Sequence, residues 1–202
     1  PQIHAQLGDY RYELFEKRPE ELETFLRQGD FDGLNVTIPY KKAVLPYCAL
    51  LSDTVKAIGS ANTLVRQKDG TLFADNTDAF GFSCILDECG VNVAGKKALV
   101  FGSGGASVTA QYVLKTRGAR TVLVISRSGE HNYENLAENA DAEILVNTTP
   151  LGMYPNNGAS PVDLAQFPRC EAVLDVVYNP ARTALLLQAE VLGIPHAGGL
   201  LM

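Results

Sequence analysis

The sequence predicts an α/β protein of two domains, each built around its own sheet. Between residues 97 and 192, short β-branched apolar runs alternate with apolar helical segments, a pattern typical of a parallel sheet covered by helices on both faces. Residues 1–80 carry shorter strand-like and helix-like segments, which predict a smaller α/β unit. The 202 residues suffice for two small domains. We expect one domain over 1–80, with 193–202 returning to it, and a second over 81–192.

Composition narrows the class of protein. Apolar residues make up 46% of the chain and charged residues 20%, which is ordinary for a globular protein. The net charge of −6 argues against nucleic acid as a main partner. No apolar run is long enough to span a bilayer, and no signal peptide is visible. The four cysteines form no zinc or C-x-x-C pattern, so we expect free thiols in a reducing cytoplasm.

The first predicted elements follow from the spacing of apolar residues and from the positions of proline and glycine. Residues 1–8 have a helical pattern, and the alternation over Tyr10–Phe15 predicts a strand. Pro19 begins a helix that Gly29 ends. The β-branched run within 34–38 predicts the next strand.

Lys41 follows the strand over 34–38. Pro39 donates no ladder hydrogen bond and suits the first turn of a helix, so Lys41 is expected at a helix start. A helix N-terminus disfavours a cation, which favours Lys41 as a proton donor and acceptor. An ordinary solvated lysine fits the same pattern.

The rest of the first unit contains short elements. Residues 40–50 predict a short helix interrupted near Pro46, and 52–59 predict a helical turn. The strands 62–66 and 71–73 flank Asp69-Gly70, which is typical hairpin chemistry. A helix over 77–90 should link the two domains.

The second unit begins with a strand over 97–101, a glycine-rich turn and an apolar helix ending at Gly118. This order is the context of a dinucleotide-binding loop, in which a helix N-terminus receives the pyrophosphate. Ser107 stands at the third fingerprint position in place of Gly or Ala, and a purely structural turn would contain the same glycines. The candidate cofactor loop comprises Gly102, Ser103, Gly104, Gly105 and Ala106.

The strand over 121–125 bears on the choice of cofactor. Enzymes that use NAD carry an acidic residue at the end of this strand for the ribose 2′-hydroxyl. Here the chain reads Ser126-Arg127-Ser128, which suits a 2′-phosphate. NADP is therefore favoured over NAD. Further strands are expected over 143–146 and 172–177, the latter containing Asp175, and an apolar helix over 181–192.

Three motifs add a family resemblance. They are N-V-T-I-P-Y-K over 35–41, A-N-T over 61–63 and N-T-D over 76–78. With G-S-G-G-A-S, S-R-S, V-N-T-T-P-L-G-M and L-D-V-V-Y-N-P further on, the chain resembles the shikimate dehydrogenase family along nearly its whole length. The resemblance implies NADPH-dependent reduction of 3-dehydroshikimate to shikimate, in a cleft between a substrate domain and a Rossmann-like domain. It implies a small-molecule substrate, no metal, and a monomer or homodimer.

The resemblance also implies roles for single residues. Lys41 is the catalytic acid/base, and Asp78 is its partner carboxylate. Substrate contacts fall on Thr37, Asn62, Asp78 and Tyr178. Cofactor contacts fall on Gly102–Ala106, Ser126, Arg127, Ser128, Thr148, Val176 and Gly199.

The chain also departs from the family pattern. Members begin with a strand and an S-x-S-P segment whose serines hold the substrate carboxylate, and they end with a glutamine and a final helix. This sequence starts at the Pro of that segment and stops at Met202, so we expect both ends to be lacking. His131 stands where some members carry a second basic residue.

Other functions remain open from the sequence alone. Quinate as the substrate, or dual use, would be decided in the absent S-x-S segment. A glutamyl-tRNA reductase shares a similar cofactor domain, but N-V-T-x-P-x-K and the acidic net charge weigh against it. A non-catalytic NADP-binding relative would not need Lys41, Asn62 and Asp78 together.

Overall fold

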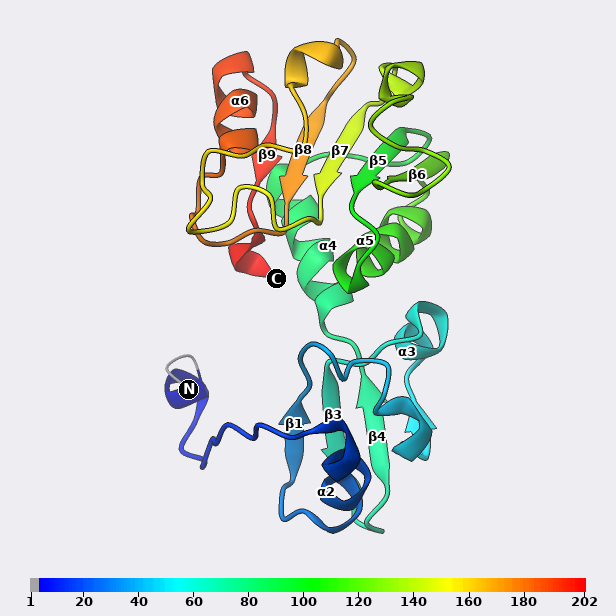
Figure 1. Ribbon diagram of the computed structural model, residues 1–202, viewed down its shortest axis with the longest axis vertical. Helices are drawn as coiled ribbons and strands as arrows, with labels where there is room; N and C mark the ends of the chain where they lie inside the picture. The colour runs from blue at the N-terminus through cyan, green and yellow to red at the C-terminus, as the bar shows by residue number, and fades with distance from the viewer. Residues whose placement is uncertain (1–3) are drawn as a thin grey trace.

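A computed structural model describes residues 4–202 and contains two separate sheets (Figure 1). The smaller sheet has the order β1-β3-β4-β2, in which β1, β3 and β4 are antiparallel and β2 is parallel to β4. Residues Leu22 and Leu26 of the helix α2 pack against Leu64 of this sheet. The elements are α2 (Leu22–Gln28), β1 (Gly33–Asn35), β2 (Leu50–Leu51), β3 (Thr63–Arg66) and β4 (Leu72–Asp75).

The larger sheet is parallel throughout, with the order β6-β5-β7-β8-β9. Its strands are β5 (Lys97–Phe101), β6 (Thr121–Ile125), β7 (Ile144–Asn147), β8 (Ala172–Asp175) and β9 (His196–Ala197). This parallel sheet and the mixed smaller sheet together confirm the predicted α/β class.

Helices cover both faces of the larger sheet, and alternate residues of each strand meet different helices. Ala98 and Val100 pack with α4 and α5, whereas Leu99 and Phe101 share a core with α6. The helices are α4 (Asp78–Cys89), α5 (Gly105–Thr116) and α6 (Ala184–Leu192). Both faces of β5, β7 and β8 are therefore buried, which explains their continuous apolar sequence.

Helix α4 links the two sheets, because it begins three residues after β4 ends. The carboxyl ends of β7 and β8 point toward the smaller sheet, and the chain ends in the same region (Figure 1). The short helices α1 (His4–Leu7) and α3 (Asp53–Ile58) and several 3-10 turns complete the described residues. Among them, no helix is long and apolar enough to cross a membrane.

Two predicted elements of the first unit are wrong. Tyr10–Phe15 forms no strand, because no neighbouring strand supplies hydrogen bonds to this segment. The side chains of Tyr10, Leu14 and Phe15 are exposed. Residues 40–50 form turns, a 3-10 turn and β2 in place of a helix. The expected helix over 1–8 is present at His4–Leu7, and residues 1–3 lie outside the described residues.

Lys41 therefore does not stand at a helix start. The backbone carbonyl of Lys41 accepts a hydrogen bond from Ala61 N–H at 2.7 Å, so it contacts the neighbouring segment and not the next turn of a helix. The Ile38–Pro39 peptide bond is cis. The predicted effect of a helix terminus on Lys41 is wrong, and its surroundings come from tertiary contacts.

Residues 193–202 also differ from expectation, because they stay with the larger sheet. Val173 and Leu174 of β8 pair with His196 and Ala197, which adds β9 as a fifth parallel strand. The backbone of Met202 then packs against Gly81 of α4, where an added Cβ would lie 2.7 Å from Met202 Cα. This packing, which the local sequence does not reveal, explains why the segment does not return to the first sheet.

Candidate active site

Three segments of the smaller unit meet around Lys41. The Lys41 carbonyl accepts from Ala61 N–H, and the carbonyl of the next residue, Asn62, accepts from Val36 N–H at 2.7 Å. Asn62 N–H donates to the carbonyl of Asp75 at 3.1 Å. These backbone hydrogen bonds bring together the ends of β1, β3 and β4, so the three sequence motifs become one site.

Lys41 forms an ion pair with Asp78. Its Nζ lies 2.6 Å from Asp78 Oδ2, and the two side chains are 30% and 20% exposed. Both groups are therefore partly shielded from water yet open to a ligand. Asp78 is the first residue of α4, where the helix N-terminus favours a carboxylate.

Asn62 holds the second oxygen of the same carboxylate. Its side-chain amide donates to Asp78 Oδ1 at 2.7 Å, while its Oδ1 accepts from Thr77 N–H at 2.9 Å. Asn76 Oδ1 accepts from Asp78 N–H at 3.1 Å, and the Asn76 amide donates to the Ser60 carbonyl at 2.9 Å. Asn76 and Thr77 thus position Asp78, a role that we did not predict although both lie inside the N-T-D motif.

This arrangement suits proton transfer. The Lys41 ammonium carries protons that a ligand oxygen can receive, and Asp78 fixes its position without needing a metal. Among residues 4–202, no group of three or more His, Cys, Asp or Glu side chains is arranged to hold a metal ion.

The glycine-rich turn leaves open space at the start of α5. Gly102 has φ +103°, and an added Cβ there would lie 2.9 Å from Thr148 Oγ1, so this position requires glycine. At Gly104 and Gly105 an added Cβ would meet nothing within 4 Å. The first N–H groups of a helix have no intrahelical partner and attract anions. The first turn of α5 contains no acidic residue, so the turn fits a pyrophosphate group.

The end of β6 provides the second candidate cofactor contact. Ser126 N–H donates to the His131 carbonyl at 3.1 Å, which folds the loop back beside the strand. Arg127 is exposed and lines a hollow with Asn132, Tyr133 and Glu134. Burial raises the pKa of Tyr133, and the Arg127 guanidinium lowers it to a lesser extent. The exposed guanidinium fits a phosphate.

The other candidate cofactor residues lie along the same edge of the sheet. Thr148 follows β7, and both its N–H and its Oγ1 donate to the Phe101 carbonyl. Val176 follows β8 and touches Gly199, where an added Cβ would collide with the Val176 carbonyl. Ligands of parallel α/β sheets bind at this carboxyl edge.

Two predicted substrate residues do not join the Lys41 cluster. Thr37 is exposed, and within residues 4–202 its hydroxyl makes only a 3.5 Å contact with the neighbouring Ile38 carbonyl. Tyr178 is 64% exposed and makes no side-chain hydrogen bond with the described residues.

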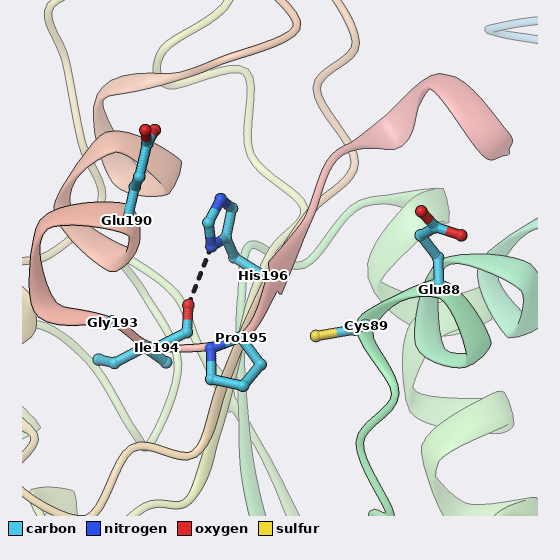
Figure 2. Close-up of a pocket in the computed structure, with 7 residues that line it drawn as sticks. All are labelled: Glu88, Cys89, Glu190, Gly193, Ile194, Pro195 and His196. Atoms are coloured by element: carbon cyan, nitrogen blue, oxygen red, sulfur yellow. Dashed lines mark hydrogen bonds between the residues drawn. The ribbon is translucent and has the colours of Figure 1, made fainter.

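A second hollow lies far from these residues, between the end of α4 and the segment around β9. Figure 2 shows His196 turned toward the Ile194 carbonyl, to which its Nδ1 lies at 2.9 Å, with Cys89 across the hollow. Burial raises the pKa of the Cys89 thiol to about 11, so it remains protonated and weakly nucleophilic at neutral pH. None of the predicted site residues lines this hollow.

Comparison with known proteins gives one consistent family. Residues 2–64 match the model of the shikimate dehydrogenase substrate binding domain. The shikimate dehydrogenase (NADP(+)) of Caldicellulosiruptor bescii is 39% identical over 202 residues, which cover 91% of this chain and 69% of that protein.

Solved structures agree with the sequence comparison. Shikimate dehydrogenase 1 from Peptoclostridium difficile is 30% identical with a TM-score of 0.85, covering 99% of this chain and 80% of that one. A shikimate 5-dehydrogenase from Thermus thermophilus, in complex with NADP(H) and shikimate, is 33% identical with a TM-score of 0.77. That match covers 91% of this chain and 72% of the other.

Proposed function

The chain belongs to the shikimate dehydrogenase family, and from this premise we propose that it reduces 3-dehydroshikimate to shikimate with NADPH, reversibly, in the shikimate pathway of aromatic amino-acid biosynthesis. The observation that supports this most strongly is the Lys41–Asp78 ion pair, held from its other side by Asn62. Ketone reduction needs a proton at the carbonyl oxygen, and Lys41 is a positioned proton donor.

Lys41 and Asp78 divide the work of acid/base catalysis. As negative charge develops on the carbonyl oxygen, Lys41 Nζ donates a proton to it. The Asp78 carboxylate orients the ammonium and stabilises its charge. In the reverse direction the neutral Lys41 amine accepts the hydroxyl proton.

NADPH supplies the hydride when it is bound. Gly102–Ala106 and the N-terminus of α5 would hold its pyrophosphate, and Ser126, Arg127 and Ser128 would hold the 2′-phosphate. Thr148, Val176 and Gly199 would line the nicotinamide end. The substrate would be bound by Asn62, Asp78, Thr37 and Tyr178. The side chains of Thr37 and Tyr178 are exposed without ligand.

The proposed function also assigns a role to each part of the chain. We propose 1–80 as the substrate domain and 81–192 as the cofactor domain, with 193–202 completing the cofactor sheet. We further propose that the protein is a monomer or homodimer, which light scattering would distinguish. Its four unpaired cysteines suit a reducing cytoplasm.

The test is NADP⁺ reduction, followed by absorbance with shikimate and separately with quinate. Lys41→Ala should reduce kcat by about 10²–10⁴-fold, the usual contribution of a general acid or base. Lys42→Ala is the matched control, because Lys42 is the adjacent lysine and is exposed.

Each result has a defined meaning. Turnover of shikimate that is lost only in Lys41→Ala supports the proposal, and faster turnover of quinate reassigns the substrate. NADPH binding without turnover of either compound would favour a non-catalytic NADP-binding relative.

A further inference from the structure

Three polar side chains are fully buried beneath the carboxyl edge of the larger sheet. Asn147 ends β7, Asp175 ends β8, and Thr183 caps the N-terminus of α6, and none has any exposed surface. Asp175 Oδ1 accepts from Val177 N–H at 2.9 Å and from the Asn147 amide at 3.0 Å. Its Oδ2 accepts from the Thr183 hydroxyl at 2.7 Å.

The network reaches the loop after β7 through Asn147. The Asn147 amide also donates to the Leu151 carbonyl at 3.2 Å. Its Oδ1 accepts from Thr149 N–H at 3.0 Å and from the Thr149 hydroxyl at 2.6 Å. Asn147 therefore fixes the conformation of the residues directly after Thr148.

The network reaches two further segments through Val177. Val177 N–H donates to Asp175, and the Val177 carbonyl accepts from Gly199 N–H at 3.1 Å. Gly199 in turn packs against Val176 so closely that no side chain fits between them. One carboxylate thus connects the loops after β7, β8 and β9.

We propose that Asp175 is a positioning residue that sets the geometry of the nicotinamide end of the cofactor site, a role that rests on the proposed function. The loops that it connects carry Thr148, Val176 and Gly199. The pyrophosphate turn meets these loops at Gly102, beside Thr148, whereas Arg127 follows β6, outside the network. Loss of the carboxylate should therefore disturb the nicotinamide end of the cofactor and spare the 2′-phosphate end that we assign to Arg127.

A purely space-filling role does not explain this choice of residue. A buried carboxylate without a charged partner is costly, whereas an apolar side chain would fill the same volume at no such cost. No salt bridge joins Asp175 to any described residue, and its contacts are the three donors from three segments. The cost is offset only by the hydrogen bonds that hold those segments together.

The test compares Asp175→Ala with Asp175→Asn in the full chain. Asp175→Ala removes every acceptor, and the displaced nicotinamide should lower kcat by about 100-fold and weaken NADPH binding about 10-fold. Binding of adenosine 2′,5′-bisphosphate, which lacks the nicotinamide end, should change less than about 2-fold. Asp175→Asn keeps the oxygen that accepts from Val177 and Asn147. It should therefore retain most of the wild-type kcat and most of the wild-type affinity for NADPH.

Two further variants separate positioning from general stability. Glu143→Ala removes a carboxylate at the opposite, amino edge of the same sheet, where it accepts from Lys97 N–H at 2.9 Å. It should lower Tm while leaving NADPH binding unchanged. Asn147→Ala removes the branch to Thr149 and Leu151 but keeps Asp175, and should show the same selective loss as Asp175→Ala.

Amide hydrogen exchange gives a readout that does not depend on turnover. Faster exchange at Val177 and Gly199 in Asp175→Ala, with unchanged exchange in β5, supports the proposal. Equal weakening of NADPH and bisphosphate binding, equal loss in the Ala and Asn variants, or unchanged exchange would overturn it. A wild-type chain that turns over neither shikimate nor quinate would refute the proposed function, while the exchange and binding experiments would still decide the role of Asp175.

Discussion

At the scale of single residues, Asp78 serves two partners with two different oxygens. Oδ2 pairs with Lys41, and Oδ1 accepts from Asn62. The position of the ammonium therefore depends on an amide that carries no charge. Asn62 also satisfies Thr77 N–H, so it combines a catalytic-site contact with a backbone contact.

Asn62→Ala tests this arrangement. We expect kcat to fall about 10–100-fold, because Asp78 loses one of its two fixed contacts. The free energy of unfolding should fall by about 0.5–1.5 kcal/mol, because Thr77 N–H loses its acceptor but is exposed and can bond water instead. Steady-state kinetics and urea unfolding measure the two effects. Asn157→Ala, in an exposed turn, is the control and should change neither.

Asp175 predicts a specific dependence of stability on pH. Burial raises its pKa from 3.8 to about 6, although hydrogen bonds from Val177, Thr183 and Asn147 oppose the shift. The folded chain then holds a proton that the unfolded chain releases between these values. The stability that the folded chain gains from this proton on Asp175 is fully present below pH 3.8. It is lost as the pH rises through about 6.

The comparison of wild type with Asp175→Asn isolates this group from the other carboxylates. The difference in their free energies of unfolding should shift by about 3 kcal/mol against the wild type between about pH 3.5 and pH 7. Urea titrations across that range measure it. A difference that stays constant with pH would contradict the assigned titration.

At the scale of elements, the turn between β5 and α5 contains two glycines with different roles. Gly102 is required by the backbone conformation, and Gly104 leaves space for the proposed pyrophosphate. Gly102→Ala should lower the free energy of unfolding by about 1–3 kcal/mol, because φ is positive there and Thr148 lies in the way. Gly104→Ala should leave stability nearly unchanged, because φ is −81° and the added Cβ meets no protein atom. It should instead weaken NADPH binding, since the methyl group occupies the proposed pyrophosphate space. Thermal unfolding and NADPH titration distinguish the two variants.

Elements with strong local signals are predictable from the sequence. The run 97–118 is correctly predicted as strand, turn and helix, because buried strands and helix ends are marked by adjacent residues. The prediction for Tyr10–Phe15 is wrong, since its alternation says nothing about whether a neighbouring strand is present. The two-residue strands β2 and β9 depend entirely on their partners β4 and β8, so no local pattern marks them.

The candidate site is predictable only in part for the same reason. The motifs name Lys41, Asn62 and Asp78, and the structure brings these three into contact. The local argument for Lys41 is wrong, because its surroundings come from segments distant in sequence. The pairing of Asp175 with Thr183 is missed because their hydrogen bond spans a loop between β8 and α6.

At the scale of the whole molecule, ligand binding should stabilise the fold by mass action. NADPH at about 100 times its Kd should add about 2.7 kcal/mol to the free energy of unfolding. NADH at the same concentration should add less, because it lacks the group that we assign to Arg127. In Arg127→Ala the two cofactors should become more nearly equal. Thermal shift assays with both cofactors measure this, and equal shifts in the wild type would contradict the assignment.

Asp78 also has a mechanical consequence. It is at once the first residue of the helix that joins the two sheets and the partner of Lys41. Because α4 packs against the larger sheet, a rotation of that sheet relative to the smaller one would move Asp78 together with the helix. Such a displacement would lengthen or shorten the 2.6 Å contact with Lys41. The helix that joins the two halves and the proton donor Lys41 are thus coupled through one ion pair.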